Sequence, residues 1–288
     1  MTRVPRSAGR IARTFARLKK ERRNALSLFL TAGFPSAEAT RRLVPALESA
    51  GADIFEIGFP FSDPIADGPV LQAASEAALR SGMTWEKLMG LARDIRRTSQ
   101  APLLFMGYAN TLYRRGWKAS ARSLARAGFD GAVIPDLIPE MDDGISRIFR
   151  KEGLALVYLC APTSSPDRLR MIAKRSTGFI YCVSVAGVTG ARRRLPESHI
   201  LGFLKKVRSV SRLPVLLGFG ISNPGQLRRF GAAADGVIIG SALANVLASG
   251  GRSGRSGRSP SLIRRAKKFI MTFSRANRAW GGDGFEKN

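Results

Sequence analysis

The chain has 288 residues, of which 44% are hydrophobic and 24% charged, and its 47 Lys and Arg against 21 Asp and Glu give a net charge of +26. This hydrophobic share excludes a wholly disordered chain, and no run approaches the roughly 18 consecutive apolar residues of a membrane span. The basic N-terminus leads to no apolar segment of about 7–15 residues, so we expect a cytoplasmic protein without a secretory signal.

Most of the excess charge lies at the two ends of the chain. Residues 1–26 and residues 248–288 each have a net charge of +8. Such a field attracts polyanions, and nucleic acid is one of them. The sequence shows no zinc-finger spacing, no RNP-like aromatic strand and no helix-turn-helix signal. We therefore expect a solvated basic surface that attracts a small phosphorylated substrate, and no nucleic-acid partner.

The first predicted element is an amphipathic helix over residues 11–26, where Ile11, Phe15 and Leu18 recur at helical spacing. Eight short apolar runs alternate with helix-sized intervals after it, and continuous hydrophobicity of this kind suits parallel strands covered on both faces. This number of strands and crossovers predicts a (β/α)8 TIM barrel, with an open doubly wound sheet as the alternative. The runs are residues 28–32, 53–58, 102–106, 131–135, 155–160, 178–183, 214–218 and 235–239.

The C-terminal part of the chain adds three predicted segments. A short extra helix covers residues 242–247, and an insert at residues 250–260 repeats Gly-Arg-Ser three times, which predicts a flexible loop. A final amphipathic helix presents Leu262, Ala266, Phe269 and Phe273 inward. We expect a single domain over residues 1–288, with flexible ends at residues 1–9 and 279–288.

Two carboxylates stand out near the end of the second predicted strand. In barrels of this kind catalytic groups lie at the carboxyl ends of the strands. Glu56 sits among apolar neighbours, where burial is costly unless the carboxyl group is hydrogen-bonded, protonated or functional. The next loop, residues 59–69, holds Asp67 between prolines, so Glu56 and Asp67 can face a ligand from different sides. Asp63 precedes Pro64, and we expect it to organise the turn.

Glycines at the ends of the last three strands predict a phosphate site. Gly218-Phe219-Gly220 follows the seventh run, and Gly240-Ser241 follows the eighth and opens the short extra helix, whose N-terminus attracts anions. The loop at residues 186–190 follows the sixth run and is placed to close over the site.

Residue types that are missing from the predicted strands and loops argue against several classes of reaction. None of the eight runs contains a Lys, which disfavours a Schiff-base aldolase. The single His, His199, stands at a predicted helix start, which argues against a His-ligated catalytic metal. There is no Walker A lysine motif and no Gly-x-Gly-x-x-Gly. The reaction class that remains is acid–base chemistry by carboxylates on a phosphorylated substrate.

One long motif identifies a family. The segment FEIGFPFSDPIADGP at residues 55–69 closely resembles the signature of the tryptophan synthase alpha subunit, and the resemblance extends from about residue 10 to the C-terminal helix. Phe55 and Phe59 are bulkier than the aliphatic residues expected there, and the Gly-Arg-Ser insert and the high net charge are unusual for the family. Further stretches agree in order and spacing at residues 29–35, 106–110, 135–137, 161–163, 183–190 and 218–222.

The resemblance implies a (β/α)8 barrel that cleaves indole-3-glycerol phosphate to indole and glyceraldehyde 3-phosphate, with no cofactor and no metal. It also implies an αββα heterotetramer with a beta subunit that receives the indole through a tunnel. By motif, Glu56 matches the general acid/base and Asp67 the carboxylate that binds the indole N–H. The substrate-binding positions that match are Phe29 and Tyr108 near the indole, Tyr181 as the active-site tyrosine of the sixth strand, Thr189 and Gly190 in the closing loop, and Gly190, Phe219, Gly220, Gly240 and Ser241 around the phosphate.

Three other functions stay open from the sequence alone. Indole-3-glycerol phosphate synthase is another phosphate-binding barrel, but the missing barrel lysines argue against it. A stand-alone lyase with the same site would release indole without a beta subunit. A basic barrel that serves mainly as an RNA- or membrane-binding scaffold is the third, and the intact pair of Glu56 and Asp67 speaks against it.

Overall fold

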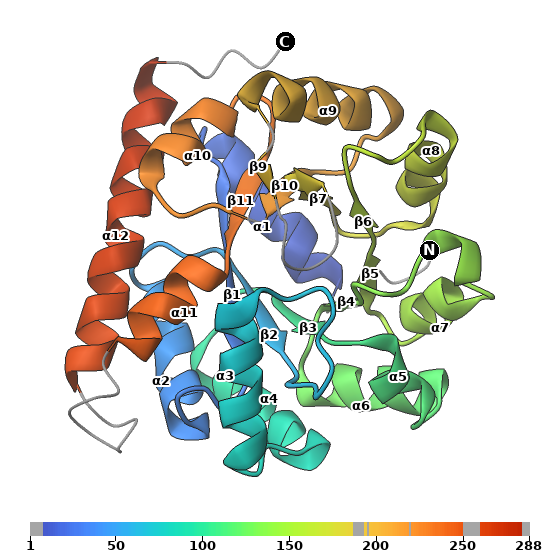
Figure 1. Ribbon diagram of the computed structural model, residues 1–288, viewed down its shortest axis with the longest axis vertical. Helices are drawn as coiled ribbons and strands as arrows, with labels where there is room; N and C mark the ends of the chain where they lie inside the picture. Colours follow the sequence, from blue (N-terminus) through green and yellow to red (C-terminus); the bar gives the residue numbers. More distant parts are fainter. Residues whose placement is uncertain (1–7, 187–192, 195, 219, 250–259, 284–288) are drawn as a thin grey trace.

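The computed structural model describes residues 8–186, 193–194, 196–218, 220–249 and 260–283, which form a parallel barrel surrounded by helices (Figure 1). Every pair of neighbouring strands in the main sheet is parallel, in the order β5-β4-β3-β2-β1-β11-β10-β7-β6. The strands are β1 Ala25–Thr31, β2 Ile54–Gly58, β3 Leu103–Met106, β4 Gly131–Val133, β5 Ala155–Val157, β6 Leu159–Cys160, β7 Ile180–Val183, β10 Val215–Gly218 and β11 Gly236–Ile239.

The sheet closes at the fifth predicted run, which the structure divides into β5 and β6 on either side of Tyr158. β5 pairs with β4 and β6 pairs with β7, while Tyr158 accepts a backbone hydrogen bond from Tyr181 at 3.2 Å. The eight predicted runs therefore all contain strands, and the barrel prediction is confirmed against the open sheet. A separate antiparallel pair joins β8 Val185–Ala186 to β9 Arg193–Arg194.

Helices cover the outside of the barrel, and two apolar layers fill the molecule. One layer lies inside the barrel and includes Phe29, Ile54, Leu104 and Tyr181, whereas the larger layer lies between the strands and the helices. The helices are α1 Ala8–Lys20, α2 Ala37–Glu48, α3 Pro69–Arg80, α4 Trp85–Thr98, α5 Ala109–Tyr113, α6 Trp117–Ala127, η1 Pro139–Met141, α7 Ile145–Lys151, α8 Pro166–Arg175, α9 Glu197–Val210, α10 Pro224–Phe230, α11 Ser241–Ala248 and α12 Pro260–Asp283.

Helix α1 packs its apolar stripe against the interior of the barrel. Ile11 and Leu18 are buried in the inner layer, and the ring of Phe15 lies 6.2 Å from that of Phe179. The predicted helix over residues 11–26 is too long, because α1 ends at Lys20 and β1 begins at Ala25. Arg22 adopts a φ of 49°, a left-handed conformation that a helix cannot continue through.

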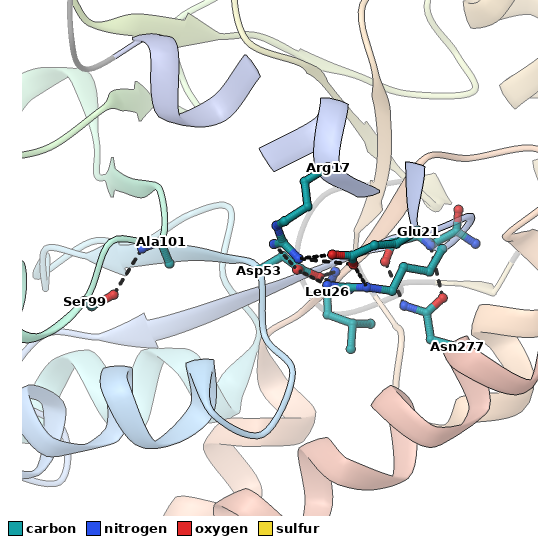
Figure 2. Close-up of polar contacts among 9 residues, drawn as sticks. Arg17, Glu21, Leu26, Asp53, Ser99, Ala101 and Asn277 are labelled. Atoms are coloured by element: carbon teal, nitrogen blue, oxygen red, sulfur yellow. Dashed lines mark hydrogen bonds and ion pairs between the residues drawn. The ribbon is translucent and has the colours of Figure 1, made fainter. Parts of the chain in front are cut away.

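A buried carboxylate anchors α1 to the start of the strands (Figure 2). Asp53, just before β2, accepts hydrogen bonds from Arg17 at 2.9 Å, from Arg23 at 2.7 Å and from the backbone N–H of Leu26 at 3.1 Å. The Asp53 side chain is only 1% exposed, so its charge is satisfied by these partners instead of water. Residue 53 thus joins α1, β1 and β2 at the N-terminal end of the barrel.

Helix α12 runs along α2, α10 and α11 on the outside of the barrel (Figure 1). Its buried side chains include Leu262, Ala266, Ile270 and Phe273, while Phe269 is partly buried. Near its end, Asn277 exchanges two hydrogen bonds with the backbone of Asn24, at 2.7 and 3.1 Å (Figure 2).

Two of the predicted flexible segments overlap helices that the structure describes. The predicted flexible end at residues 279–288 overlaps α12, which continues to Asp283 although Gly281 and Gly282 are poor helix formers. Helix α1 likewise begins at Ala8, within the range 1–9. Residues 1–7, 250–259 and 284–288 lie outside the described residues, and Pro260 begins α12. None of the helices in the described part of the chain is long and apolar enough to cross a membrane.

Candidate active site

A cavity of about 530 Å³ opens at the carboxyl ends of the strands and brings together residues from β1, β7, β11 and the loops that follow β2, β10 and β11. This volume is within the range of small-molecule sites. Six of the predicted site residues line it: Phe29, Asp67, Tyr181, Gly220, Gly240 and Ser241. The other lining residues are Leu71, Met106, Ile221, Ser222, Ile238, Ala242, Asn245 and Phe269.

Glu56 lies inside the barrel opposite Phe29, which lines the cavity, but Glu56 is not itself one of the lining residues. It is 0% exposed, and its neighbours in register are Phe29 on β1 and Leu104 on β3, which both belong to the inner apolar layer. Its Oε1 accepts a hydrogen bond of 2.7 Å from the Ser27 hydroxyl. Burial raises the pKa of Glu56 to about 7, although the Ser27 hydrogen bond lowers it. The carboxyl group can therefore both hold and release a proton near neutral pH.

Asp67 is held at the edge of the cavity by the loop after β2. The Tyr108 hydroxyl donates a hydrogen bond of 3.4 Å to Asp67 Oδ2 and accepts one of 2.9 Å from the backbone N–H of Ala66. The ring of Phe61 stacks on Tyr108 at a centroid distance of 5.1 Å. Burial and the charge of Asp67 raise the pKa of Tyr108, so its phenol stays a hydrogen-bond donor. Tyr108 thus lies behind Asp67 and does not line the cavity.

Two aromatic rings reach the cavity because glycines stand beside them. A Cβ atom on Gly58 would lie 2.4 Å from the ring of Phe29, and one on Gly218 would lie 2.6 Å from the ring of Tyr181. Any larger residue at either strand end would displace these rings. Burial raises the pKa of Tyr181 well above its usual value, and the charges of Glu56 and Asp67 raise it further. Tyr181 is therefore electrostatically coupled to both carboxylates.

The segments that follow β10 and β11 offer backbone groups suited to an anion. Gly240 precedes α11, and Ser241 and Ala242 of its first turn line the cavity, so free N–H groups of this helix end lie beside it. The neighbouring loop is held by Gln226, which accepts hydrogen bonds from Ser222 N at 2.7 Å and Asn223 N at 3.1 Å and donates one to the Gly220 carbonyl at 2.9 Å. Gln226 therefore fixes the shape of the loop over residues 220–223.

Some predictions cannot be placed, and some site residues were not predicted. Thr189, Gly190 and Phe219 lie outside the described residues. Gln226 was missed, although the spacing of Asn223 and Gln226 is a capping-box signal that follows the predicted glycine turn. Ser27 was missed as well, and its position two residues before Phe29 on the same strand face was the available signal. Asn245 and Phe269 carry no such signal, because only helix packing brings them to the cavity.

Comparison with known proteins gives a consistent result. A family model described as tryptophan synthase alpha chain matches residues 15–270. The tryptophan synthase alpha chain of Geotalea daltonii is 45% identical over 235 residues, which cover 82% of this chain and 89% of that protein. That of Roseiflexus castenholzii is 46% identical over 239 residues, covering 83% and 91%. A crystal structure of tryptophan synthase subunit alpha from Legionella pneumophila matches with a TM-score of 0.84 at 34% identity, covering 93% of this chain and 97% of the other.

Proposed function

We propose that Glu56 and Asp67 carry the chemistry of this chain, which belongs to the tryptophan synthase alpha chain family. Membership makes the protein a carbon–carbon lyase of tryptophan biosynthesis, which cleaves indole-3-glycerol phosphate to indole and glyceraldehyde 3-phosphate. The observation that supports the assignment of Glu56 is its place inside the barrel, where burial brings its pKa to about 7.

The reaction is a retro-aldol cleavage with three requirements. A proton must be placed on indole C3, positive charge must be stabilised at the ring nitrogen, and a proton must leave the adjacent hydroxyl of the glycerol chain. Glu56 transfers the protons, since a carboxyl group that titrates near neutrality serves as both acid and base. Asp67 accepts a hydrogen bond from the indole N–H and stabilises the charge that develops there. No cofactor or metal enters this scheme.

The phosphate binds at the side of the cavity formed by Gly220, Gly240 and Ser241. The support for this proposal is the start of α11 beside the cavity and the loop that Gln226 holds in place. Thr189, Gly190 and Phe219 join this site by motif resemblance, and Phe29 and Tyr181 flank the indole.

A beta subunit is the partner that the family implies, and we propose an αββα heterotetramer. Two segments would face this partner by motif resemblance: residues 59–69, which follow β2, and residues 186–190, which come after β7 in the sequence. The first of these exposes Ile65, which is 63% accessible, beside the half-buried Phe61. We also propose a cytoplasmic location, which is supported by Cys160 and Cys182, two buried thiols whose sulfur atoms lie 3.4 Å apart without a disulfide bond.

The deciding experiment measures indole release from indole-3-glycerol phosphate by the purified chain, with and without a cognate beta subunit. We expect Glu56→Gln to remain folded and to lose about 10²–10⁴-fold in turnover, the range for loss of a general acid–base group. Glu86→Gln, which changes an exposed carboxylate on α4, is the control.

Two results would contradict parts of this proposal. Turnover of folded Glu56→Gln near that of the wild type would remove Glu56 from the chemistry. If a cognate beta subunit neither bound nor changed the rate, the chain would be a stand-alone indole-releasing lyase.

A further inference from the structure

Ser27 is a buried polar side chain at the centre of the barrel. It lies on β1, between β11 and β2, with Ile238 and Ile54 as its partners in register, and it is 0% exposed. Side chains alternate along a strand, so Ser27 shares the inward face of β1 with Ala25 and Phe29 of the inner apolar layer. A hydroxyl group in such a place is costly unless it is hydrogen-bonded.

The partner of Ser27 is the carboxyl group of Glu56. The two side chains come from neighbouring strands and meet because the parallel register sets Glu56 opposite Phe29, two residues beyond Ser27. The Ser27 hydroxyl donates to Glu56 Oε1 at 2.7 Å, a short distance typical of a hydrogen bond to a carboxylate.

This hydrogen bond distinguishes the two oxygens of Glu56. Oε1 is bound by Ser27, whereas Oε2 is buried and has no hydrogen-bond partner among the described residues. A buried carboxyl oxygen without a partner is unfavourable in a structural role. At a catalytic carboxyl group it is the oxygen left free to exchange a proton with the substrate.

We propose that Ser27 is a positioning residue of the lyase reaction, and that its hydroxyl holds Glu56 Oε1 so that Oε2 performs the proton transfers. The inference rests on the proposed function of Glu56. In this proposal the Ser27 side chain, on the strand next to β2, sets the rotational orientation of the Glu56 carboxyl group. The bond also favours the ionised carboxylate and therefore offsets part of the increase in pKa that burial causes.

The test compares turnover and pH dependence in variants of Ser27. In Ser27→Ala we expect kcat to fall about tenfold with little change in KM, because a single hydrogen bond to an ionised group is lost while the substrate contacts remain. The limb of the pH profile governed by Glu56 should move to higher pH, since the interaction that favours its ionised form has been removed. Circular dichroism and thermal unfolding confirm that the variant is folded.

A matched pair of variants separates the hydroxyl group from side-chain volume. Ser27→Thr and Ser27→Val add nearly equal bulk to the barrel interior, but only Thr keeps a hydroxyl group, so Ser27→Thr should retain higher kcat and the lower pKa. Ser120→Ala is the control for stability, because it removes another buried hydroxyl that donates to the Leu112 carbonyl on the outside of the barrel.

The outcomes keep the two proposals apart. If Ser27→Ala keeps the wild-type kcat and pH profile while Glu56→Gln is inactive, the assignment of Ser27 is wrong and that of Glu56 stands. Equal losses in the Thr and Val variants, or faster turnover in Ser27→Ala, would also overturn it. If folded Glu56→Gln is as active as the wild type, the proposed function of Glu56 fails first.

Discussion

The acid–base behaviour of Glu56 follows from its position on β2. An ordinary Glu has a pKa of about 4.5, and complete burial inside the barrel raises that of Glu56 to about 7. The folded protein therefore binds this proton more tightly than the unfolded chain does. Linkage then requires the contribution of Glu56 to stability to be largest below about pH 4.5 and to be lost as the pH rises through 7.

This linkage can be measured with Glu56→Gln, which cannot titrate. Between pH 5 and pH 8, the free energy of unfolding of the wild type should fall relative to that of the variant by about 2 to 3 kcal/mol. Urea denaturation of both proteins at several pH values provides the comparison, and other titrating groups cancel in the difference. Parallel pH profiles would show that burial does not raise the pKa of Glu56.

Tyr108 supports the second carboxylate, and its hydroxyl group can be removed without changing the ring. Tyr108→Phe should lower kcat by about tenfold, less than Asp67→Asn does, because Asp67 loses one hydrogen bond but keeps its charge. Tyr113→Phe is the control, since that side chain is 70% exposed. A rate equal to that of the wild type would mean that the loop after β2 holds Asp67 without help from Tyr108.

At the scale of elements, the ion pairs that stabilise the fold and the groups of the candidate site lie at opposite ends of the barrel. The carboxyl ends of β1, β2 and β7 carry the candidate site, whereas Asp53 at the N-terminal end joins α1 to β1 and β2 (Figure 2). Arg17 and Arg23 approach the same carboxylate from α1 and the turn after it. This arrangement predicts that α1 can be weakened without changing the catalytic groups.

Asp53→Asn should destabilise the protein by about 1–3 kcal/mol, because it removes the buried carboxylate that Arg17 and Arg23 share and leaves them only the exposed Glu21. Asp94→Asn on α4 is the matched control, since it breaks an exposed pair with Arg97 and should cost less than about 1 kcal/mol. Urea denaturation measures both, and turnover per folded molecule should stay near that of the wild type. If Asp53→Asn and Asp94→Asn lost equal stability, burial of Asp53 would not strengthen its ion pairs.

For the whole molecule, the dominant physical property is its net charge of +26. A positive field raises the encounter rate with an anionic substrate, and salt screens that field with a Debye length of about 8–10 Å near physiological ionic strength. The field offers the same attraction to any small phosphorylated compound, so specificity must come from the cavity. The expectation that the protein has no nucleic-acid partner stays a prediction.

The charge leads to an expected salt dependence. As NaCl rises from about 10 to 500 mM, kcat/KM for indole-3-glycerol phosphate should fall severalfold while kcat changes little, because screening affects encounter and not the bound complex. Steady-state assays across a salt series measure both constants. A parallel decrease in kcat would mean that salt perturbs the site itself and that the long-range field is not the cause.

Most of the elements, and the motif that carries the chemistry, could be predicted from the sequence. Eight apolar runs predicted the strands, since hydrophobic patterns are local, and a lone Glu in an apolar strand followed by the loop with Asp67 indicated carboxylate chemistry. The end of α1 was predicted too late, because the start of β1 depends on pairing with β11 across about 210 residues of chain.

The meeting of distant side chains could not be predicted from the sequence, because it depends on how the barrel closes. Ser27 and Glu56 are 29 residues apart, and Asn24 and Asn277 are 253 apart, so their hydrogen bonds depend on strand register and barrel closure. Phe269 and Asn245 line the cavity because α12 packs on α11 at its edge. Local propensity specifies what each segment becomes, but these pairings arise when the closed barrel places distant segments side by side, and no short stretch of sequence contains that information.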